Sequence, residues 1–117
     1  MEFKHIPVLL NESIEGLNIQ EDGIYVDCTV GGAGHSSEIL KKIKSNGHLY
    51  GFDQDAVAIE TAQARLSKIS PQFTLIHTNF RNMKGELKVR GITKVNGILF
   101  DLGVSSYQFD NGDRGFS

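Results

Sequence analysis

The chain has 117 residues, which is enough for one hydrophobic core and short for two domains of ordinary size. Its composition, 39% hydrophobic and 22% charged, is typical of globular proteins, and we expect neither a signal peptide nor the apolar run of about 20 residues that crosses a bilayer. The single cysteine, Cys28, excludes an internal disulfide framework or thiolate zinc cluster and favours the cytoplasm, while the formal charge of −2 gives no overall support for nucleic-acid binding.

The spacing of apolar residues predicts helices and strands in alternation. The predicted elements are a helix at 8–17, a strand at 23–29, a helix at 36–45, a strand at 48–52, a helix at 55–69, a strand at 73–77, a weaker helix at 80–89 and a strand at 95–101. This order predicts an α/β fold with a doubly wound parallel sheet, of which four strands make about half. Because the chain stops in the polar sequence DRGFS, we expect residues 1–117 to be part of a longer domain.

The turn after the first predicted strand, VGGAGHS, has several possible ligands. A phosphate-binding P-loop needs a lysine after its last glycine, and here His35 and Ser36 follow Gly34. A dinucleotide turn needs G-x-G-x-x-G, and Ser37 stands where the third glycine belongs. A turn whose backbone approaches a sugar and a carboxylate remains possible, and so does a turn that only joins a strand to a helix.

Asp53 favours a nucleoside. It ends the second strand, 19 residues after Gly34, where a carboxylate accepts hydrogen bonds from ribose hydroxyls. The alternative is that Asp53 or Asp55 caps the next helix, and the two roles could be divided between them. After the third strand, Phe80 is placed either to pack on an adenine ring or to join the core.

The end of the fourth predicted strand, DLGVSS at 101–106, combines a carboxylate, a glycine and two hydroxyls. Ligands of open parallel sheets collect at the carboxyl ends of the strands, so these residues favour function over core packing.

At this point the sequence resembles a known family. The segments HIPVLL at 5–10, GIYVDCTVGGAGHS at 23–36, GFDQD at 51–55, NF at 79–80, GILFDLGVSSYQFD at 97–110 and RGFS at 114–117 are similar to the MraW-type bacterial methyltransferases. These enzymes use S-adenosylmethionine to modify the N4 amine of a cytosine in 16S (small-subunit) ribosomal RNA. The resemblance implies a Rossmann-like class I methyltransferase fold, with the 30S subunit as partner.

Carried over by position, the resemblance assigns cofactor contacts, which are Ala33, Gly34, His35, Asp53, Phe80, Asp101 and Gln108. Members of the family are longer, with further strands and an inserted helical domain. The resemblance therefore implies that 1–117 is the N-terminal part of the methyltransferase domain, and we expect this part to be inactive alone.

The catalytic hypothesis concerns the end of the fourth strand. The exocyclic amine of cytosine is a weak nucleophile because its lone pair is delocalised, so acceptors for its N–H groups would promote attack on the methyl group. The candidate acceptors are the Asp101 carboxylate, which could instead serve only the cofactor, and the backbone carbonyls of Leu102–Ser105. Ser105 or Ser106 would orient the base.

Two other functions stay open. One is a non-catalytic S-adenosylmethionine-binding half-domain, which could form a homodimer if the fourth strand were an exposed sheet edge. The other is a fragment of an NAD-dependent oxidoreductase, which the missing third glycine disfavours.

Overall fold

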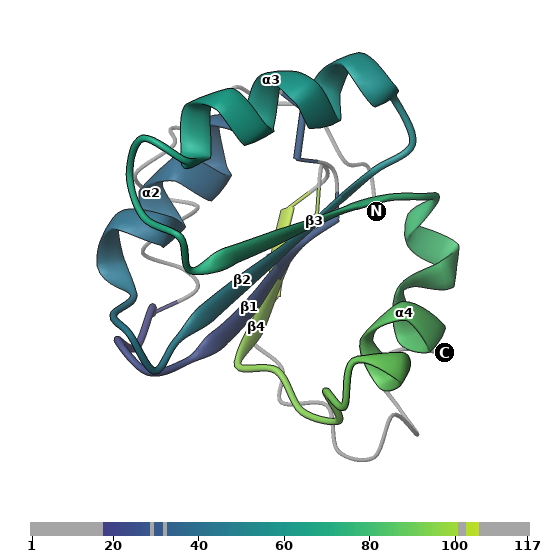
Figure 1. Ribbon diagram of the computed structural model, residues 1–117. Helices are drawn as coiled ribbons and strands as arrows, with labels where there is room; N and C mark the ends of the chain where they lie inside the picture. The colour runs from purple at the N-terminus through teal and green to yellow at the C-terminus, as the bar shows by residue number, and fades with distance from the viewer. Residues whose placement is uncertain (1–17, 29, 32, 101–102, 106–117) are drawn as a thin grey trace.

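The computed structural model describes residues 18–28, 30–31, 33–100 and 103–105, and they form three layers (Figure 1). A twisted sheet is covered by helices α2 and α3 on one face and by α4 on the other. This arrangement confirms the predicted α/β class. The predicted helix at 8–17 lies outside the described residues. Within the described part, no helix combines the length and apolar character needed to cross a membrane.

The sheet has five strands in the order β3-β2-β1-β4-β5. Their bounds are β1 Ile24–Asp27, β2 His48–Asp53, β3 Phe73–His77, β4 Gly97–Phe100 and β5 Gly103–Ser105. The first four are mutually parallel, with β1 paired to both β2 and β4. The strand order therefore reverses at β1: β2 and β3 lie on one side of it, and β4 lies on the other.

The helices are α2 Gly34–Lys42, α3 Ala56–Leu66 and α4 Met83–Val89, with a 3₁₀ turn η1 at Phe80–Asn82 before α4. The sequence pattern correctly placed all three helices and misjudged some of their ends. The third predicted helix continued to residue 69, whereas α3 ends at Leu66, because the chain tightens there into a turn with a hydrogen bond from Ile69 N to Leu66 O.

Each face of the sheet has its own apolar cluster. Under α2 and α3 the cluster includes Tyr25, Ile39, Leu49, Leu66 and Leu99. Under α4 the second cluster comprises Val26, Cys28, Tyr50, Phe52, Ile76, Met83, Leu87, Val95 and Ile98. Alternate residues of the strands supply opposite faces, so the nearly continuous apolar runs of β1 and β2 are explained by burial on both sides.

The short strand β5 was not predicted. Gly103–Ser105 pairs antiparallel with β4, in a segment to which we assigned only the end of the fourth strand. This pairing also corrects the dimer hypothesis: β4 is not an edge strand, because β5 covers it. The homodimer proposed through a free β4 edge therefore lacks the exposed strand on which it depended.

Candidate functional site

The predicted site residues gather where the parallel strands end. Asp27 is the last residue of β1, and Asp53 and His77 end β2 and β3 in direct register with each other. The segments that follow these three strands lead to α2, α3 and η1. In an open parallel sheet this edge is the one at which ligands bind, so the fold brings together predicted site residues from Ala33 to Phe80, which span 48 positions of the sequence.

The glycine-rich turn is held in an unusual backbone conformation. Ala33, the N-cap of α2, has φ 71° and ψ 22°, in the left-handed region that glycine favours, and Gly31 also has positive φ. The turn is stabilised locally, since Ala33 N donates to Val30 O at 2.7 Å and Ala33 O accepts from both Ser37 N and Ser37 Oγ. These contacts start α2 directly beside the turn.

The space beside Gly34 is open. A Cβ added to this glycine would meet no atom within 4 Å among the described residues. Gly34 and His35 are the first residues of α2, and the first N–H groups of a helix have no acceptor within the helix. This end of α2 can therefore present N–H groups and a positive helix-dipole end to a ligand carboxylate.

Asp53 connects the segment that follows β1 to the segment that follows β2. Its Oδ2 accepts a hydrogen bond from Gly31 N at 2.9 Å, and its Oδ1 accepts from Asp55 N at 2.9 Å. Helix capping belongs to Asp55, whose Oδ1 accepts from Val57 N. The division of roles left open by the sequence is thus resolved for the cap, and Asp53 gains a contact that the sequence did not predict, to the glycine turn itself.

A second link fastens the glycine turn to β2. Val30 N donates to Phe52 O at 3.0 Å, immediately before the residue that binds Asp53. The chain can pass this closely because β2 carries Gly51 at that point: a Cβ there would lie 3.3 Å from Val30 Cγ2 and 2.9 Å from Leu75 Cδ2. The glycine of GFDQD therefore admits Val30 and so positions the turn.

The third segment carries the aromatic candidate. Phe80 begins η1 and is 49% exposed, which contradicts the alternative that it is a core residue. The backbone that leads into Phe80 is held by Asn79. The Asn79 Oδ1 accepts a hydrogen bond from Arg81 N, and its Nδ2 donates one to Gln54 Oε1 at 3.0 Å. Since Gln54 follows Asp53, this amide pair ties the aromatic segment to the carboxylate segment.

Sequence reasoning missed the buried pair Asp27 and Ser36. Ser36 Oγ donates to Asp27 Oδ2 at 2.6 Å, and both residues are at most 2% exposed. The bond joins the end of β1 to the first turn of α2, and a charge-assisted bond of this kind is stronger than a neutral one. The sequence did contain one indication of this bond, the charge of Asp27, because an aspartate in an otherwise apolar strand needs a buried partner.

Cys28 follows Asp27 and is buried against Met83, with the two sulfur atoms 3.9 Å apart. Burial, assisted by the negative charge of Asp27, raises the pKa of the Cys28 thiol to about 12. A thiol held in this protonated state is a poor nucleophile, so Cys28 acts as a packing residue.

The predicted site residues divide into three groups. Ala33, Gly34, His35, Asp53 and Phe80 lie on or at the ends of the segments that follow β1, β2 and β3 at one edge of the sheet. Ser105 lies farther from this edge, because β5 runs antiparallel to β4 and its last residue, Ser105, pairs with Ile98 rather than with Phe100 at the end of β4. Asp101, Ser106 and Gln108 lie outside the described residues.

Comparison with known proteins identifies relatives over almost the whole chain. The chain is 58% identical over 117 residues to ribosomal RNA small subunit methyltransferase H of Clostridioides difficile, covering all of this chain and 38% of that protein. It is 62% identical over 115 residues to the protein of the same name from Exiguobacterium sibiricum, covering 98% of this chain and 36% of that protein. The chain therefore spans less than two fifths of the length of these curated relatives.

The fold is shared with solved methyltransferase structures. A SAM-dependent O-methyltransferase of Thermotoga maritima superposes with a TM-score of 0.65 at 13% sequence identity, over 86% of this chain and 36% of that protein. At this identity the likeness establishes the Rossmann-like fold alone.

The family assignment comes from the sequence model of the MraW methylase family, which matches residues 2–117. The match includes every segment from which the resemblance was inferred, and it agrees with the two curated relatives. The chain belongs to the MraW methylase family.

Proposed function

We propose that this chain is the N-terminal, cofactor-binding part of an S-adenosylmethionine-dependent methyltransferase domain that acts on small-subunit ribosomal RNA. The observation that carries the proposal is the Asp53 carboxylate, which joins the end of β2 to Gly31 of the glycine turn, three residues before Gly34 at the start of α2. Membership of the MraW methylase family supports the reaction type, and the names of the relatives support ribosomal RNA as the substrate.

The residues present fit the chemistry of this cofactor. Each Asp53 oxygen accepts one backbone hydrogen bond, which leaves lone pairs for the two ribose hydroxyls. The half-exposed ring of Phe80 offers a face for adenine, and the N-terminal turn of α2 offers N–H groups for the amino-acid carboxylate. Among the predicted contacts, Ala33, Gly34 and His35 would act at this helix end, and Asp101 and Gln108 would complete the site.

When bound, the cofactor supplies an electrophilic methyl group on a sulfonium. We propose the cytosine N4 amine as the nucleophile that would take this methyl group and lose a proton to an acceptor on this chain. Asp101 is the proposed acceptor, with Ser105 or Ser106 orienting the base. Such a displacement depends mainly on positioning, which suits a site built on strand ends.

The proposed partner is the 30S subunit or its RNA, and the proposed compartment is the cytoplasm. The relatives are more than twice as long as this chain, so we propose that methyl transfer to RNA needs more of the domain than residues 1–117. Cofactor binding, by contrast, should be measurable on this chain, because all seven proposed contacts lie within residues 1–117.

The test is calorimetric titration of the chain with S-adenosylmethionine and, separately, with NAD. We expect heat with the first ligand only. Heat with NAD alone would overturn the proposal and restore the oxidoreductase hypothesis, which the aspartate at the end of β2 also fits.

A second measurement addresses the reaction. Transfer of a labelled methyl group to small-subunit RNA is assayed with this chain and with the full-length Clostridioides difficile relative as positive control. We expect incorporation with the relative alone. Incorporation by the 117-residue chain would show that it is active by itself, and absence of label at cytosine N4 in the relative's product would refute the proposed position.

A further inference from the structure

The charges of this chain are not evenly distributed. Residues 80–94 contain five of its twelve basic residues and one of its fourteen acidic residues, so this segment has a formal charge of +4 while the whole chain has −2. The basic residues are Arg81, Lys84, Lys88, Arg90 and Lys94, all exposed. The remaining residues together carry −6, so the low net charge conceals a strongly cationic segment comprising η1, α4 and the turn that follows.

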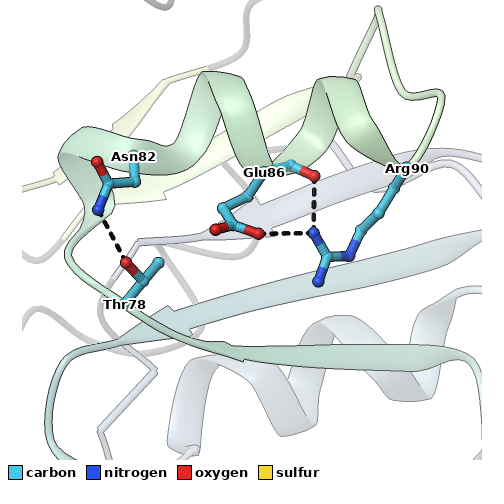
Figure 2. Close-up of polar contacts among 4 residues, drawn as sticks. All are labelled: Thr78, Asn82, Glu86 and Arg90. Carbon is cyan, nitrogen blue, oxygen red and sulfur yellow. Dashed lines mark hydrogen bonds and ion pairs between the residues drawn. The ribbon is translucent and has the colours of Figure 1, made fainter.

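The acidic residue of this segment is already neutralised. Glu86 forms an ion pair with Arg90, with Oε1 and Nη1 2.8 Å apart, and Arg90 Nη1 also donates to the Glu86 backbone oxygen (Figure 2). Asn82 Nδ2 donates to Thr78 Oγ1 on the same side of the helix, one turn earlier (Figure 2). Asn82, Glu86 and Arg90 recur every four positions, so they occupy one flank from the end of η1 to the C-cap of α4, and Thr78 contacts this flank from the segment before η1.

The lysines occupy another flank. Met83 and Leu87 face the core, and Lys84 and Lys88 follow each of them by one position, again one helical turn apart. Arg81 precedes them in η1. Within the described residues, none of these three cations is in an ion pair. They form what we call the α4 basic face, defined as Arg81, Lys84 and Lys88.

Among the residues that the structure describes, little obstructs the outer surface of α4. None of them has an atom within 4 Å of the position that a Cβ on Gly85 would occupy, and Gly85 forms part of a shallow hollow with Arg81, Asn82, Glu86 and Val89. The Val89 side chain is 79% exposed beside it. Arg81 is the member of the α4 basic face that lines this hollow, so a polyanion bound to the face could also place sugar and base surfaces against Gly85 and Val89.

The α4 basic face begins at the candidate site. Arg81 directly follows Phe80, at the strand-end edge, and α4 then runs back along the sheet face opposite α2 and α3 (Figure 1). We propose that the α4 basic face binds the phosphate backbone of the RNA substrate, so that the nucleotide to be modified is held near the strand ends. This inference rests on the proposed function, since it assigns a surface to its RNA substrate. We choose RNA as the ligand because the phosphates of an RNA strand are repeated along its length, as the cations are along the helix.

The test measures how RNA affinity depends on salt. The variant Lys84→Gln/Lys88→Gln removes two charges from exposed sites and keeps a good helix former at each. The matched control, Lys42→Gln/Lys68→Gln, removes two charges from exposed lysines at the ends of α2 and α3, on the opposite face of the sheet. Far-ultraviolet circular dichroism and thermal unfolding confirm that both variants fold like the wild type.

The probe is a short fluorescein-labelled single-stranded RNA, followed by fluorescence anisotropy over a range of potassium chloride concentrations. If both lysines contact phosphates, the slope of log Kobs against log salt concentration should fall in magnitude by about 1.4, or about 0.7 per contact. The control should keep the wild-type slope. Equal slopes in wild type and the α4 variant, or failure of the wild type to bind the RNA, would refute the inference.

Two further measurements identify which proposal fails. The same preparations are titrated with S-adenosylmethionine. Normal cofactor affinity together with an unchanged salt slope for RNA binding would refute the role of the α4 basic face and leave the proposed function intact. Absence of cofactor binding by the wild type would refute the proposed function. Competition by polyglutamate as effective as that by unlabelled RNA of equal charge would assign the α4 basic face to an acidic protein and overturn the choice of RNA.

Discussion

Asp53 provides the sharpest test of the candidate site. Both of its carboxylate oxygens accept hydrogen bonds from backbone N–H groups, those of Gly31 and Asp55. In Asp53→Asn one oxygen becomes an NH₂ group, which cannot accept, so one of the two N–H groups loses its partner and the remaining oxygen has fewer lone pairs for a ligand. A hydrogen bond to a charged group contributes about 1.5–3 kcal/mol, so we expect the Kd for S-adenosylmethionine to rise about 10-fold to 100-fold.

The matched control is Asp55→Asn, two residues along the chain. Asp55 caps α3 through its bond from Val57 N, and asparagine caps a helix as well as aspartate does. We expect this variant to keep the wild-type Kd, as measured by calorimetric titration of both variants. Wild-type affinity in Asp53→Asn, or an equal loss in Asp55→Asn, would refute the assignment of Asp53 to the ligand.

Three further predictions concern stability. Ser36→Ala removes a buried charge-assisted hydrogen bond and should lower the free energy of unfolding in urea by about 1.5–3 kcal/mol, whereas Ser37→Ala removes a neutral one and should cost about 1 kcal/mol; equal losses would contradict the charged character of the first bond. The folded Cys28 thiol, with its pKa raised from 9.0 to about 12, stays protonated where the unfolded thiol ionises, so its contribution to stability is complete below pH 9 and is lost as pH rises towards 12; a Cys28→Ala variant should show a weaker fall in urea midpoint between pH 9 and 10, and the same fall as wild type would exclude this cause. Gly47→Ala would place a Cβ 2.6 Å from a backbone oxygen and should destabilise the protein by about 1–3 kcal/mol, whereas Gly85→Ala, in open space on a helix, should stabilise it by about 0.5–1 kcal/mol, and thermal unfolding of the two variants should show opposite shifts.

The sequence was most informative where local pattern and tertiary structure agree. The strand at 73–77 was predicted with the bounds it has, because an alternating apolar pattern follows Pro71 and ends at polar residues. The strand β5 was missed, since three residues that include a glycine carry no pattern of their own and become a strand only by pairing with β4.

The site shows the same division. Asp53 and Phe80 could be proposed from their positions after strands, which depend on chain order alone. The bond between Ser36 and Asp27 could not, because it depends on the rotation of α2 about its axis relative to β1, and this rotation is set by where the helix begins, at Gly34. The α4 basic face was missed for a different reason. The net charge averages over the chain and conceals the basic segment at 80–94, and only the structure shows that Arg81, Lys84 and Lys88 are exposed on η1 and α4 and outside any ion pair among the described residues.

The two bonds that fasten the glycine turn to β2 bear on the kinetics and thermodynamics of ligand capture. Val30 N and Gly31 N are both held by β2 before any ligand arrives, and Ala33 is already in its left-handed conformation. Fixing one residue's backbone costs about 1–2 kcal/mol in conformational entropy. Because the turn is already ordered in the folded protein, ligand binding does not have to supply this free energy. Cofactor association should therefore need no slow ordering step in this turn, and the amide protons of Val30 and Gly31 should exchange slowly with solvent even in the ligand-free protein.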